Sequence, residues 1–401
     1  MSANISYSRR VQAVRPSATM ARAARAGQLK REGKDIVSLT VGEPDFPVLP
    51  HVKEAMEVAL AKGHTKYTAS NGIVELREAI VAWMKSEEGV AFQLPQVIAC
   101  AGAKQALFNA CQSLLDEGDE AVVPNPYWVS YPDMVKLAGA APVELHLKAE
   151  NGWVPKPGDL AKVLTEKTRV LILGSPSNPT GAILPEAALR ALADELRAFP
   201  RVVVLSDDIY GPLWFTQRAP NLLNVAPDLA DRTVLVHGCS KAFAMTGLRI
   251  GWACGPQPII AAMNKVQDSS TSNPSSIAQW GAVAALRGSQ VGVEAMRERF
   301  ATRRVLMTEA LAAIPGVKAA LPDGAFYVFP DVSALLTKKH KGAVVGTTLR
   351  LAEILLDEYG LAVVPGSAFG AEGFLRISFA AHEDDLLRGA ERLARLAGAL
   401  E

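Results

Sequence analysis

One lysine, Lys241, stands alone in the stretch HGCSKAFAMTGLRIGW (residues 237–252), with Arg249 eight positions further along the chain. The lysine lies between a serine and a run of small apolar residues, and Gly238, Gly247 and Gly251 flank it within the stretch. This setting suggests that the amine itself is used as a reactive group. A solvated loop charge is the alternative at this point.

Three further loops follow predicted strands, where open α/β sheets bind their ligands. Gly102 and Ala103 begin a predicted helix, whose free N–H groups favour an anion such as phosphate, although a glycine there is also ordinary turn chemistry. Asp207 ends a strand, where a buried carboxylate needs a cation; a helix cap is the alternative. Asn178 lies in GSPSNPTG, which by itself is only a proline-rich turn.

Short apolar segments supply the elements that must position these residues. Most are β-branched and apolar on both faces, as expected of strands buried between helical layers. The segments are VIAC (97–100), AVVP (121–124), PVEL (142–145), RVLILG (169–174), RVVVLS (201–206), TVLVHG (233–238) and RIGWAC (249–254). Helical patterns run between several of them, including 104–115 and 185–199, the latter with Pro185 in its first turn. The alternation predicts an α/β fold with a mainly parallel, seven-stranded sheet.

The pattern changes after residue 257. A helical stretch over 292–314 precedes strand-like AFYVF (325–329), LAVVPG (361–366) and FLRISFA (374–380), and an amphipathic helix over 383–400 closes the chain. We therefore expect a second, smaller α+β domain. The predicted division is an N-terminal arm and part of the small domain over 1–48, a large domain over 49–290 and a C-terminal small domain over 291–401.

Composition excludes several classes of protein. The chain has 401 residues and a formal net charge of +1, without blocks of like charge, so neither a nucleic-acid surface nor a membrane patch is expected. No apolar run reaches the length of a membrane span. Four cysteines lie far apart without a CxxC pair, which argues against a disulfide framework or a metal site and favours reduced thiols in the cytoplasm.

Common nucleotide, protease and hydrolase motifs are missing, namely GxGxxG after a strand, the P-loop, HExxH and GxSxG. One cofactor fits what remains. Pyridoxal phosphate needs a lysine for its Schiff base, an acid opposite its pyridine nitrogen, phosphate donors at a helix N-terminus and a flat surface beneath its ring. Lys241, Asp207, the Gly102 region with Arg249, and Trp128 could supply all four.

The chain resembles the fold type I, pyridoxal-phosphate-dependent aminotransferases of class I/II, and is similar to the bacterial aspartate aminotransferases that often also accept prephenate. The resemblance runs from about residue 9 to the C-terminus. It is carried, in order, by RPSAT, VGEPDF, KYTASNGIVELREAI, GAKQALFN, NPYWVSYPDMV, SPSNPTGA, SDDIY, SKAFAMTGLRIGW and LRISFA.

The resemblance implies roles for cofactor-site residues. Lys241 would form the Schiff base and move the proton, and Asp207 would keep the pyridine nitrogen protonated. Tyr210 and Asn178 would hydrogen-bond the cofactor's phenolic oxygen. The other implied cofactor contacts are Gly102, Ala103 and Lys104 at the helix start, Trp128 stacked on the ring, and Ser240 and Arg249 on the phosphate. Many relatives have a serine where this chain has Gly238.

Tyr67 resembles a tyrosine that reaches the phosphate of a neighbouring subunit, which implies a homodimer with shared active sites. An interface aromatic without cofactor contact is the alternative.

Substrate recognition is implied for a second group of residues. Arg376 matches the clamp for the α-carboxylate, with Gly42, Asn178 and Trp128 nearby. Lys104 and Thr19 match the residues that recognise the distal carboxylate of a dicarboxylic substrate. We therefore expect transfer of an amino group between aspartate or glutamate and 2-oxoglutarate, oxaloacetate or prephenate. If Thr19 lines the site, the arginine-rich stretch before it belongs to the working enzyme.

Departures from the family pattern leave alternatives open. The family usually has Glu at position 208, where this chain has Asp208, and Trp at position 248, where it has Leu248. HGCSK, with His237, replaces a more usual Asn-Gly stretch. An aminotransferase for another amino acid, or a carbon–sulfur lyase or synthase on the same fold, remains an alternative. A transcriptional regulator is disfavoured, because only about forty residues precede VGEPDF.

Overall fold

A central sheet of seven strands organises the residues that the structure, a computed structural model, describes (backbone of 6–14 and 18–401, side chains of 6–14 and 21–401). The strand order is β2-β8-β7-β6-β5-β3-β4. Only β8 runs against its neighbours within this sheet, since it pairs antiparallel with both β2 and β7 while the other pairs are parallel. The predicted α/β fold with a mainly parallel sheet is confirmed.

The seven strands coincide closely with the predicted apolar segments. They are β2 (Val97–Cys100), β3 (Glu120–Asn125), β4 (Ala141–His146), β5 (Thr168–Gly174), β6 (Val203–Asp207), β7 (Thr233–Gly238) and β8 (Gly251–Cys254). The largest displacements are at the starts of β6 and β8, which each begin two residues later than predicted. The segment predicted for β8 begins at Arg249. Arg249 lies outside the strand because its backbone is left-handed, with φ +53°, a conformation that a strand cannot contain.

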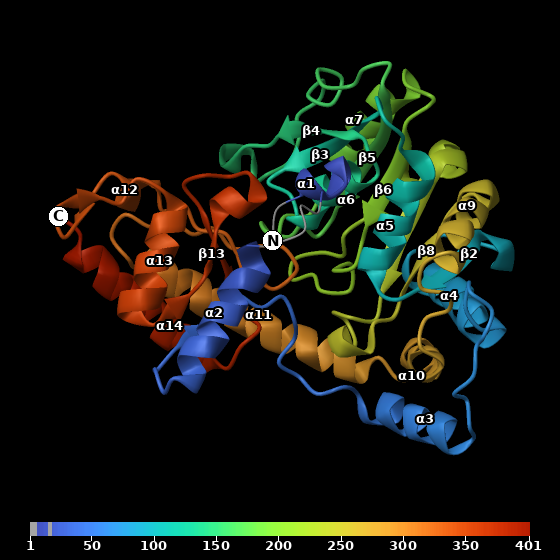
Figure 1. Ribbon diagram of the computed structural model, residues 1–401, viewed down its shortest axis with the longest axis horizontal. Coiled ribbons are helices and arrows are strands. Elements are labelled where there is room, and N and C mark those ends of the chain that lie inside the picture. Colours follow the sequence, from blue (N-terminus) through green and yellow to red (C-terminus); the bar gives the residue numbers. More distant parts are fainter. Residues whose placement is uncertain (1–5, 15–17) are drawn as a thin grey trace.

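Helices cover both faces of the sheet (Figure 1). Val170 and Ile172 of β5 pack in the core that includes α5 (Ala103–Leu114) and α6 (Ser130–Leu137), whereas Leu171 and Leu173 pack on the side of α7 (Glu186–Arg197) and α8 (Leu222–Val225). This alternation is the period of two expected for a strand buried on both sides. The remaining helices around the sheet are α4 (Val74–Glu87), α9 (Gln257–Asp268) and α10 (Ser276–Arg287).

The second half of the fold is smaller and mixed. A three-stranded sheet has the order β13-β14-β9, formed by Val364–Pro365, Leu375–Ser378 and Tyr327–Val328. Helices α11 (Val291–Ala312), α13 (Thr348–Tyr359) and α14 (Glu383–Ala399) lie beside it, as does α2 (Ala18–Arg31) from the N-terminal region (Figure 1). The 361–366 segment, predicted as one strand, forms two, because β12 (Leu361–Ala362) pairs with β1 (Val37–Ser38) and β13 pairs with β14.

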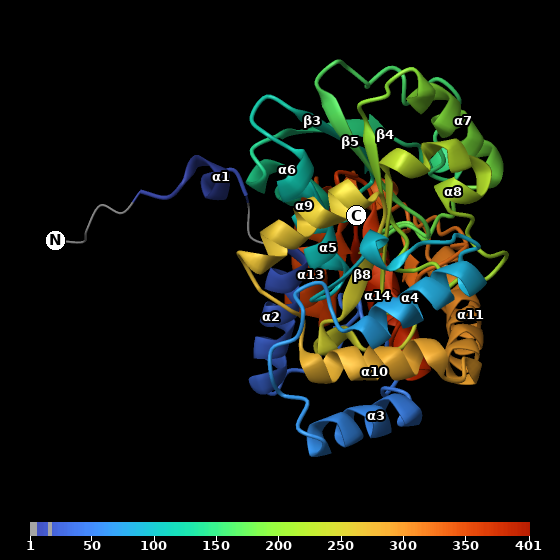
Figure 2. The same ribbon diagram turned by 90° about the vertical axis from the view of Figure 1, so that its right-hand side faces the viewer.

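The peripheral elements complete the description. These are α1 (Arg9–Gln12), α3 (Pro50–Ala61), α12 (Ser333–Leu336), β10 (Lys339–His340) and β11 (Ala343–Val344). Helix α3 packs on α10, and α1 lies beside α6 at one edge of the molecule (Figure 2). Pro185 precedes α7 as its N-cap and does not lie inside the first turn. Among the described residues, none of the helices is long and apolar enough to cross a membrane. The division into domains at residues 48 and 290 stays a prediction.

Candidate active site

A cavity of about 330 Å³ lies at the carboxyl ends of the parallel strands, between the central sheet and the smaller sheet. Its walls include eleven residues predicted for the site, drawn from segments far apart in the sequence. They are Gly42, Ala103, Lys104, Trp128, Asn178, Asp207, Tyr210, Ser240, Lys241, Arg249 and Arg376. We call this space the central cavity. Its position agrees with the general rule for ligand sites in open α/β sheets.

Lys241 enters the central cavity from the loop after β7. Its Nζ donates a hydrogen bond to the carbonyl of Gly42 at 2.5 Å and lies 6.0 Å from the centre of the Tyr210 ring. Burial lowers the pKa of this amine to about 8, and the positive charges of Arg249 and Arg376 act in the same direction against Glu43. A sizeable fraction of the amine is therefore neutral near pH 7 to 8, which a nucleophile requires.

Arg249 lies across the start of α5. Its guanidinium donates to the carbonyls of Thr246 at 2.8 Å and Ala101 at 3.4 Å. A Cβ at Gly102 would lie 2.6 Å from Nη2 of Arg249, and Gly102 has φ +91°. Only glycine both lacks a Cβ and adopts this positive φ without strain. The guanidinium can therefore lie directly beside the free N–H groups at the start of the helix. The combination of a planar cation and a helix N-terminus suits a phosphate group.

Asp207 is the last residue of β6 and is 5% exposed. Its Oδ2 accepts a hydrogen bond from the Tyr131 hydroxyl at 2.7 Å, and Oδ1 accepts from the Ile209 amide at 3.4 Å. Burial raises the pKa of this carboxyl to about 6, although the two hydrogen bonds and Lys241 oppose the rise. A cation in the cavity would complete the compensation of this charge.

Tyr210, after β6, and Tyr327, in β9 of the smaller sheet, connect the two halves of the fold in the wall of the central cavity. Their hydroxyls are 2.7 Å apart, and both side chains are buried. Gly42 touches this pair, since a Cβ at residue 42 would lie 2.5 Å from the Tyr327 hydroxyl. Burial, reinforced by Tyr327, raises the pKa of Tyr210 well above its ordinary value, so this phenol is a neutral hydrogen-bond donor near neutral pH.

Arg376 of β14 contributes to the wall of the central cavity from the smaller sheet. Its Nη1 donates to Asn178 Oδ1 at 3.1 Å and its Nη2 donates to the Thr40 carbonyl at 2.5 Å. The guanidinium lies 4.5 Å from the centre of the Tyr327 ring. Within the described part of the chain its Nε has no partner. A buried cation held in this way, beside an amide, is suited to a carboxylate.

Trp128 and Lys104 lie together at the mouth of the cavity. Lys104 Nζ is 4.7 Å from the centre of the indole ring, and this ring meets Tyr131 edge to face at 84°. Ser240 is buried beside Lys241. The indole therefore offers a flat face, and Lys104 adds a positive charge at the rim.

Three predicted residues are not in the cavity wall. Gly102 lies directly behind it, under Arg249. Tyr67 is 91% exposed and is not part of the cavity wall, so its role toward a neighbouring subunit stays a prediction. Thr19 falls in α2, and its side chain is outside the described residues.

Two site residues were missed from the sequence. Tyr131 holds Asp207, and Tyr327 holds Tyr210. Each follows the rhythm of apolar residues in its own segment, so both look like core aromatics. The nearest signal is the two tyrosines in NPYWVSYP, of which one comes three residues after Trp128.

The comparisons with known proteins agree with this geometry. The family described as Aminotransferase class I and II matches residues 34–393. The chain belongs to this family. The resemblance indicated by its motifs is thus confirmed, and the protein is an aminotransferase.

Individual relatives match this aminotransferase over nearly its whole length. It is 46% identical to the aspartate/prephenate aminotransferase of Thermus thermophilus over 394 residues, covering 98% of each chain. It is 42% identical to the aspartate/prephenate aminotransferase of Nitrosomonas europaea, covering 97% of this chain and 99% of the relative. The crystal structure of an aspartate aminotransferase from Rhizobium meliloti superposes with a TM-score of 0.96 at 40% identity, covering 99% and 100% of the two chains.

Proposed function

We propose that this aminotransferase uses pyridoxal phosphate to exchange an amino group between aspartate or glutamate and 2-oxoglutarate or oxaloacetate, with prephenate as a further oxo-acid substrate. The observation that carries the proposal is the convergence of Lys241, Asp207 and Arg249 on one cavity that also contains Arg376. The names of the Thermus and Nitrosomonas relatives support the choice of substrates.

The residues present fit the cofactor. Gly102 leaves room for Arg249 at the helix start, where a phosphate would be held. Asp207 is a buried carboxylate that faces the cavity, where a protonated ring nitrogen would lie. Lys241 would hold the cofactor covalently, Trp128 would cover its ring, and Ser240 would add a hydroxyl near the phosphate. When bound, pyridoxal phosphate accepts the electron pair that remains when the substrate loses its α-proton.

The protein's own residues would position and deprotonate the substrate. Arg376 and Asn178 would bind the α-carboxylate, with Gly42 leaving space beside them. Once released, the Lys241 amine would take the α-proton and return it, for which its pKa of about 8 is suitable. Tyr210 would donate a hydrogen bond to the phenolic oxygen of the cofactor. Lys104, with Thr19, would attract the second carboxylate of the substrate.

We further propose a homodimer in which Tyr67 reaches the neighbouring subunit's phosphate, and a location in the cytoplasm. The exposure of Tyr67 is consistent with a contact to another chain.

A panel of amino donors and oxo acids tests the proposal. The purified protein should have a visible absorption band that is lost in Lys241→Ala, and a colourless protein that binds no pyridoxal phosphate would contradict the cofactor assignment. Lys104→Ala should lower kcat/KM for aspartate by about 10- to 100-fold, the loss of one charge-assisted contact. Lys85→Ala, on an exposed face of α4, is the control. Equal use of aspartate and hydrophobic donors would overturn the substrate assignment.

A further inference from the structure

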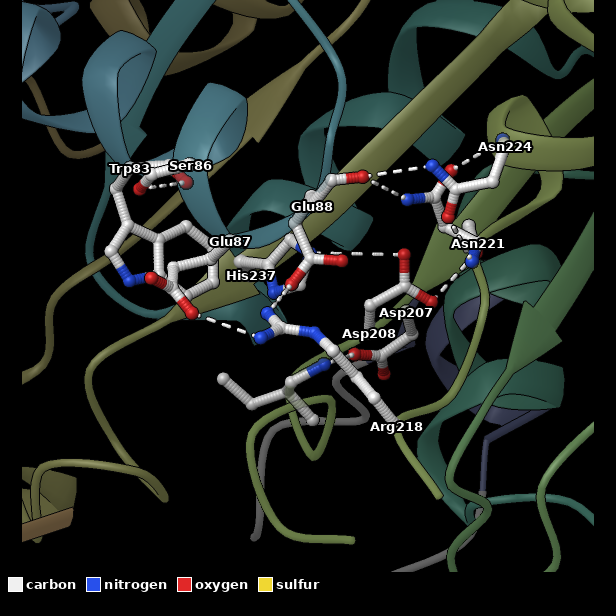
Figure 3. Close-up of polar contacts among 12 residues, drawn as sticks. Trp83, Ser86, Glu87, Glu88, Asp207, Asp208, Arg218, Asn221, Asn224 and His237 are labelled. Atoms are coloured by element: carbon white, nitrogen blue, oxygen red, sulfur yellow. Dashed lines mark hydrogen bonds and ion pairs between the residues drawn. The ribbon is translucent and has the colours of Figure 1, made fainter. Parts of the chain in front are cut away.

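A cluster of buried ionisable side chains lies next to Asp207 (Figure 3). Its members Asp208, His237 and Glu88 are not part of the wall of the central cavity. Asp208 follows Asp207 directly, and both carboxylates are almost fully buried. Asp208 Oδ1 accepts a hydrogen bond from the Ser206 hydroxyl at 2.8 Å. Its Oδ2 has no hydrogen-bond partner among the described residues. Two adjacent buried carboxylates repel each other when both are charged, so something must relieve Asp208 of its charge.

His237 of β7 faces that free oxygen. Its Nε2 lies 3.8 Å from Asp208 Oδ2 and 4.0 Å from Glu88 Oε1. The imidazole is stacked on Trp252 at 21° and meets Trp83 at 72°, so its neighbours on these sides are uncharged rings. Like Asp208 Oδ2, His237 Nε2 makes no hydrogen bond within the described chain.

Glu88, the third acid of the cluster, has its own counter-charge. Its Oε1 lies 3.0 Å from Nη2 of Arg218, whose Nη1 is 2.9 Å from Glu87. The backbone carbonyl of Glu88 accepts hydrogen bonds from the side chains of Asn221 at 3.1 Å and Asn224 at 2.8 Å, which hold it in place (Figure 3). Arg218 thus compensates Glu88, and Asp208 and His237 are left to balance each other.

We propose that Asp208 and His237 hold one proton between them and act as a positioning pair for Asp207. With one proton, on the carboxyl or on the imidazole, the pair is neutral overall. No proton would leave a second anion beside Asp207, and two protons would leave a buried cation. The charged or titratable groups that face the pair are Glu88 and Arg218, which compensate each other, and Asp207.

The electrostatic surroundings of Asp208 and His237 agree with a single shared proton. Burial, with Glu88 adding to it, raises the pKa of Asp208 well above its ordinary value. Burial lowers the pKa of His237, although the negative charge of Glu88 opposes this. The consequence, which rests on the proposed function, is that Asp207 is left as the charged carboxylate that meets the cofactor.

The number of protons on the pair can be measured from the pH dependence of stability. Between about pH 4.5 and 6.5, an unfolded chain has Asp ionised and His protonated. Folded Asp208→Asn would keep His237 neutral, so its unfolding constant relative to wild type should rise as the pH falls. Folded His237→Gln would keep Asp208 protonated, so its relative unfolding constant should rise as the pH rises. Each change approaches tenfold per pH unit, measured by urea unfolding of the cofactor-loaded protein at fixed concentration.

The double variant Asp208→Asn/His237→Gln should show the pH dependence of the wild type in this window. A slope unchanged by Asp208→Asn alone would mean that the pair holds no proton. A slope unchanged by His237→Gln alone would mean that it holds two. Either result overturns the proposal.

His340→Gln is the matched control, since it removes another buried histidine, 3.1 Å from Glu358 in the smaller half of the fold. The changes in the free energy of unfolding caused by His340→Gln and Asp208→Asn should add in the double variant. Those caused by His237→Gln and Asp208→Asn should not add, because these two residues share the proton.

A second measurement on the wild-type protein covers the case that a variant does not fold. In NMR spectra of protein with ¹⁵N-labelled histidine, the His237 imidazole should keep one protonation state from pH 5 to 8. Titration of His237 within this range would overturn the proposal. These readouts follow protons of the protein. A colourless protein would therefore reject the proposed function alone, and wrong slopes in a protein with its visible band would reject the shared proton alone.

Discussion

Arg249 and Gly102 are packed so closely that a Cβ on residue 102 would lie 2.6 Å from a guanidinium nitrogen. The backbone of each residue is left-handed, at φ +53° and φ +91°. The anion site that we propose at the start of α5 therefore depends on a glycine that leaves space and on an arginine that occupies it.

Gly102→Ala should weaken the binding of pyridoxal phosphate by at least tenfold, because the new methyl group displaces Arg249 and strains the helix start. Titration of the ligand-free protein with pyridoxal phosphate, followed by absorbance, measures this. Gly118→Ala is the control, since Gly118 has φ +95° and nothing within 4 Å of its Cβ position. Gly118→Ala should lose about 1 kcal/mol of folding stability for its positive φ, as Gly102→Ala does, but should keep the wild-type affinity for pyridoxal phosphate. Equal affinities in the two variants would exclude a role of the Gly102–Arg249 contact.

Asp207→Asn should stabilise the ligand-free protein at pH 7 while abolishing most of the activity. The pKa of Asp207 is raised to about 6 in the folded protein, so the folded state binds this proton more tightly than the unfolded chain. The resulting stability is complete below about pH 4 and is lost as the pH rises through 6. The asparagine variant avoids a loss on the order of 3 kcal/mol above pH 6, an advantage that disappears toward pH 4.

Unfolding of the ligand-free protein at pH 4.5, 6 and 7.5 checks the sign of this effect. The exposed Asp231→Asn serves as the control. If Asp207→Asn were destabilising at pH 7.5, the unfavourable burial of this carboxylate would be disproved.

Tyr327→Phe should lower kcat/KM by about tenfold, the value of one hydrogen bond, and change its pH dependence. The variant removes the hydroxyl that lies 2.7 Å from Tyr210 and that contributes to the raised pKa of Tyr210. We therefore expect the pKa of Tyr210 to fall toward its ordinary value, which an alkaline titration of tyrosine absorbance can follow. Tyr359→Phe, in α13, is the control, and identical pH profiles for the two variants would argue against a positioning role of Tyr327.

Mixing two defective chains tests the proposed role of Tyr67 in a dimer. In a hybrid of Lys241→Ala and Tyr67→Ala subunits, one site keeps its own lysine and receives Tyr67 from the other chain. Denaturing and refolding the mixture should restore up to about a quarter of wild-type sites. If Tyr67 acted within its own chain, each hybrid site would contain one defect and mixing would restore nothing.

Much of the central sheet was predictable, because its strands are apolar on both faces and end at turn residues. β2 and β7 have the predicted bounds, and the other five start or end within two residues of them. The sequence predicts Arg249 inside a strand, since nothing in RIGWAC indicates that its first two residues precede the paired part of β8. The sequence predicts one strand over 361–366, because a change of sheet partner leaves no mark on hydrophobic periodicity.

The site divides in the same way. Lys241 and Asp207 could be found because a charged residue stands beside an apolar segment, and Arg376 because LRISFA resembles the family pattern. Tyr131 and Tyr327 could not, because a buried tyrosine that donates a hydrogen bond has the same sequence pattern as one that only packs. The closeness of Asp208, His237 and Glu88 depends on tertiary contacts between β6, β7 and the end of α4, which a single sequence does not reveal.

The reversed strand β8 has a further consequence. Because the chain turns back after β7, Lys241 and Arg249 are carried by one hairpin, whereas Arg376 is carried by β14 of the other sheet. The lysine and the arginine that we propose as anchors of the cofactor thus belong to one structural unit, and the arginine that we propose for the α-carboxylate of the substrate belongs to another. A shift of one sheet against the other would therefore change the distance between Arg376 and the Lys241–Arg249 pair while leaving that pair intact.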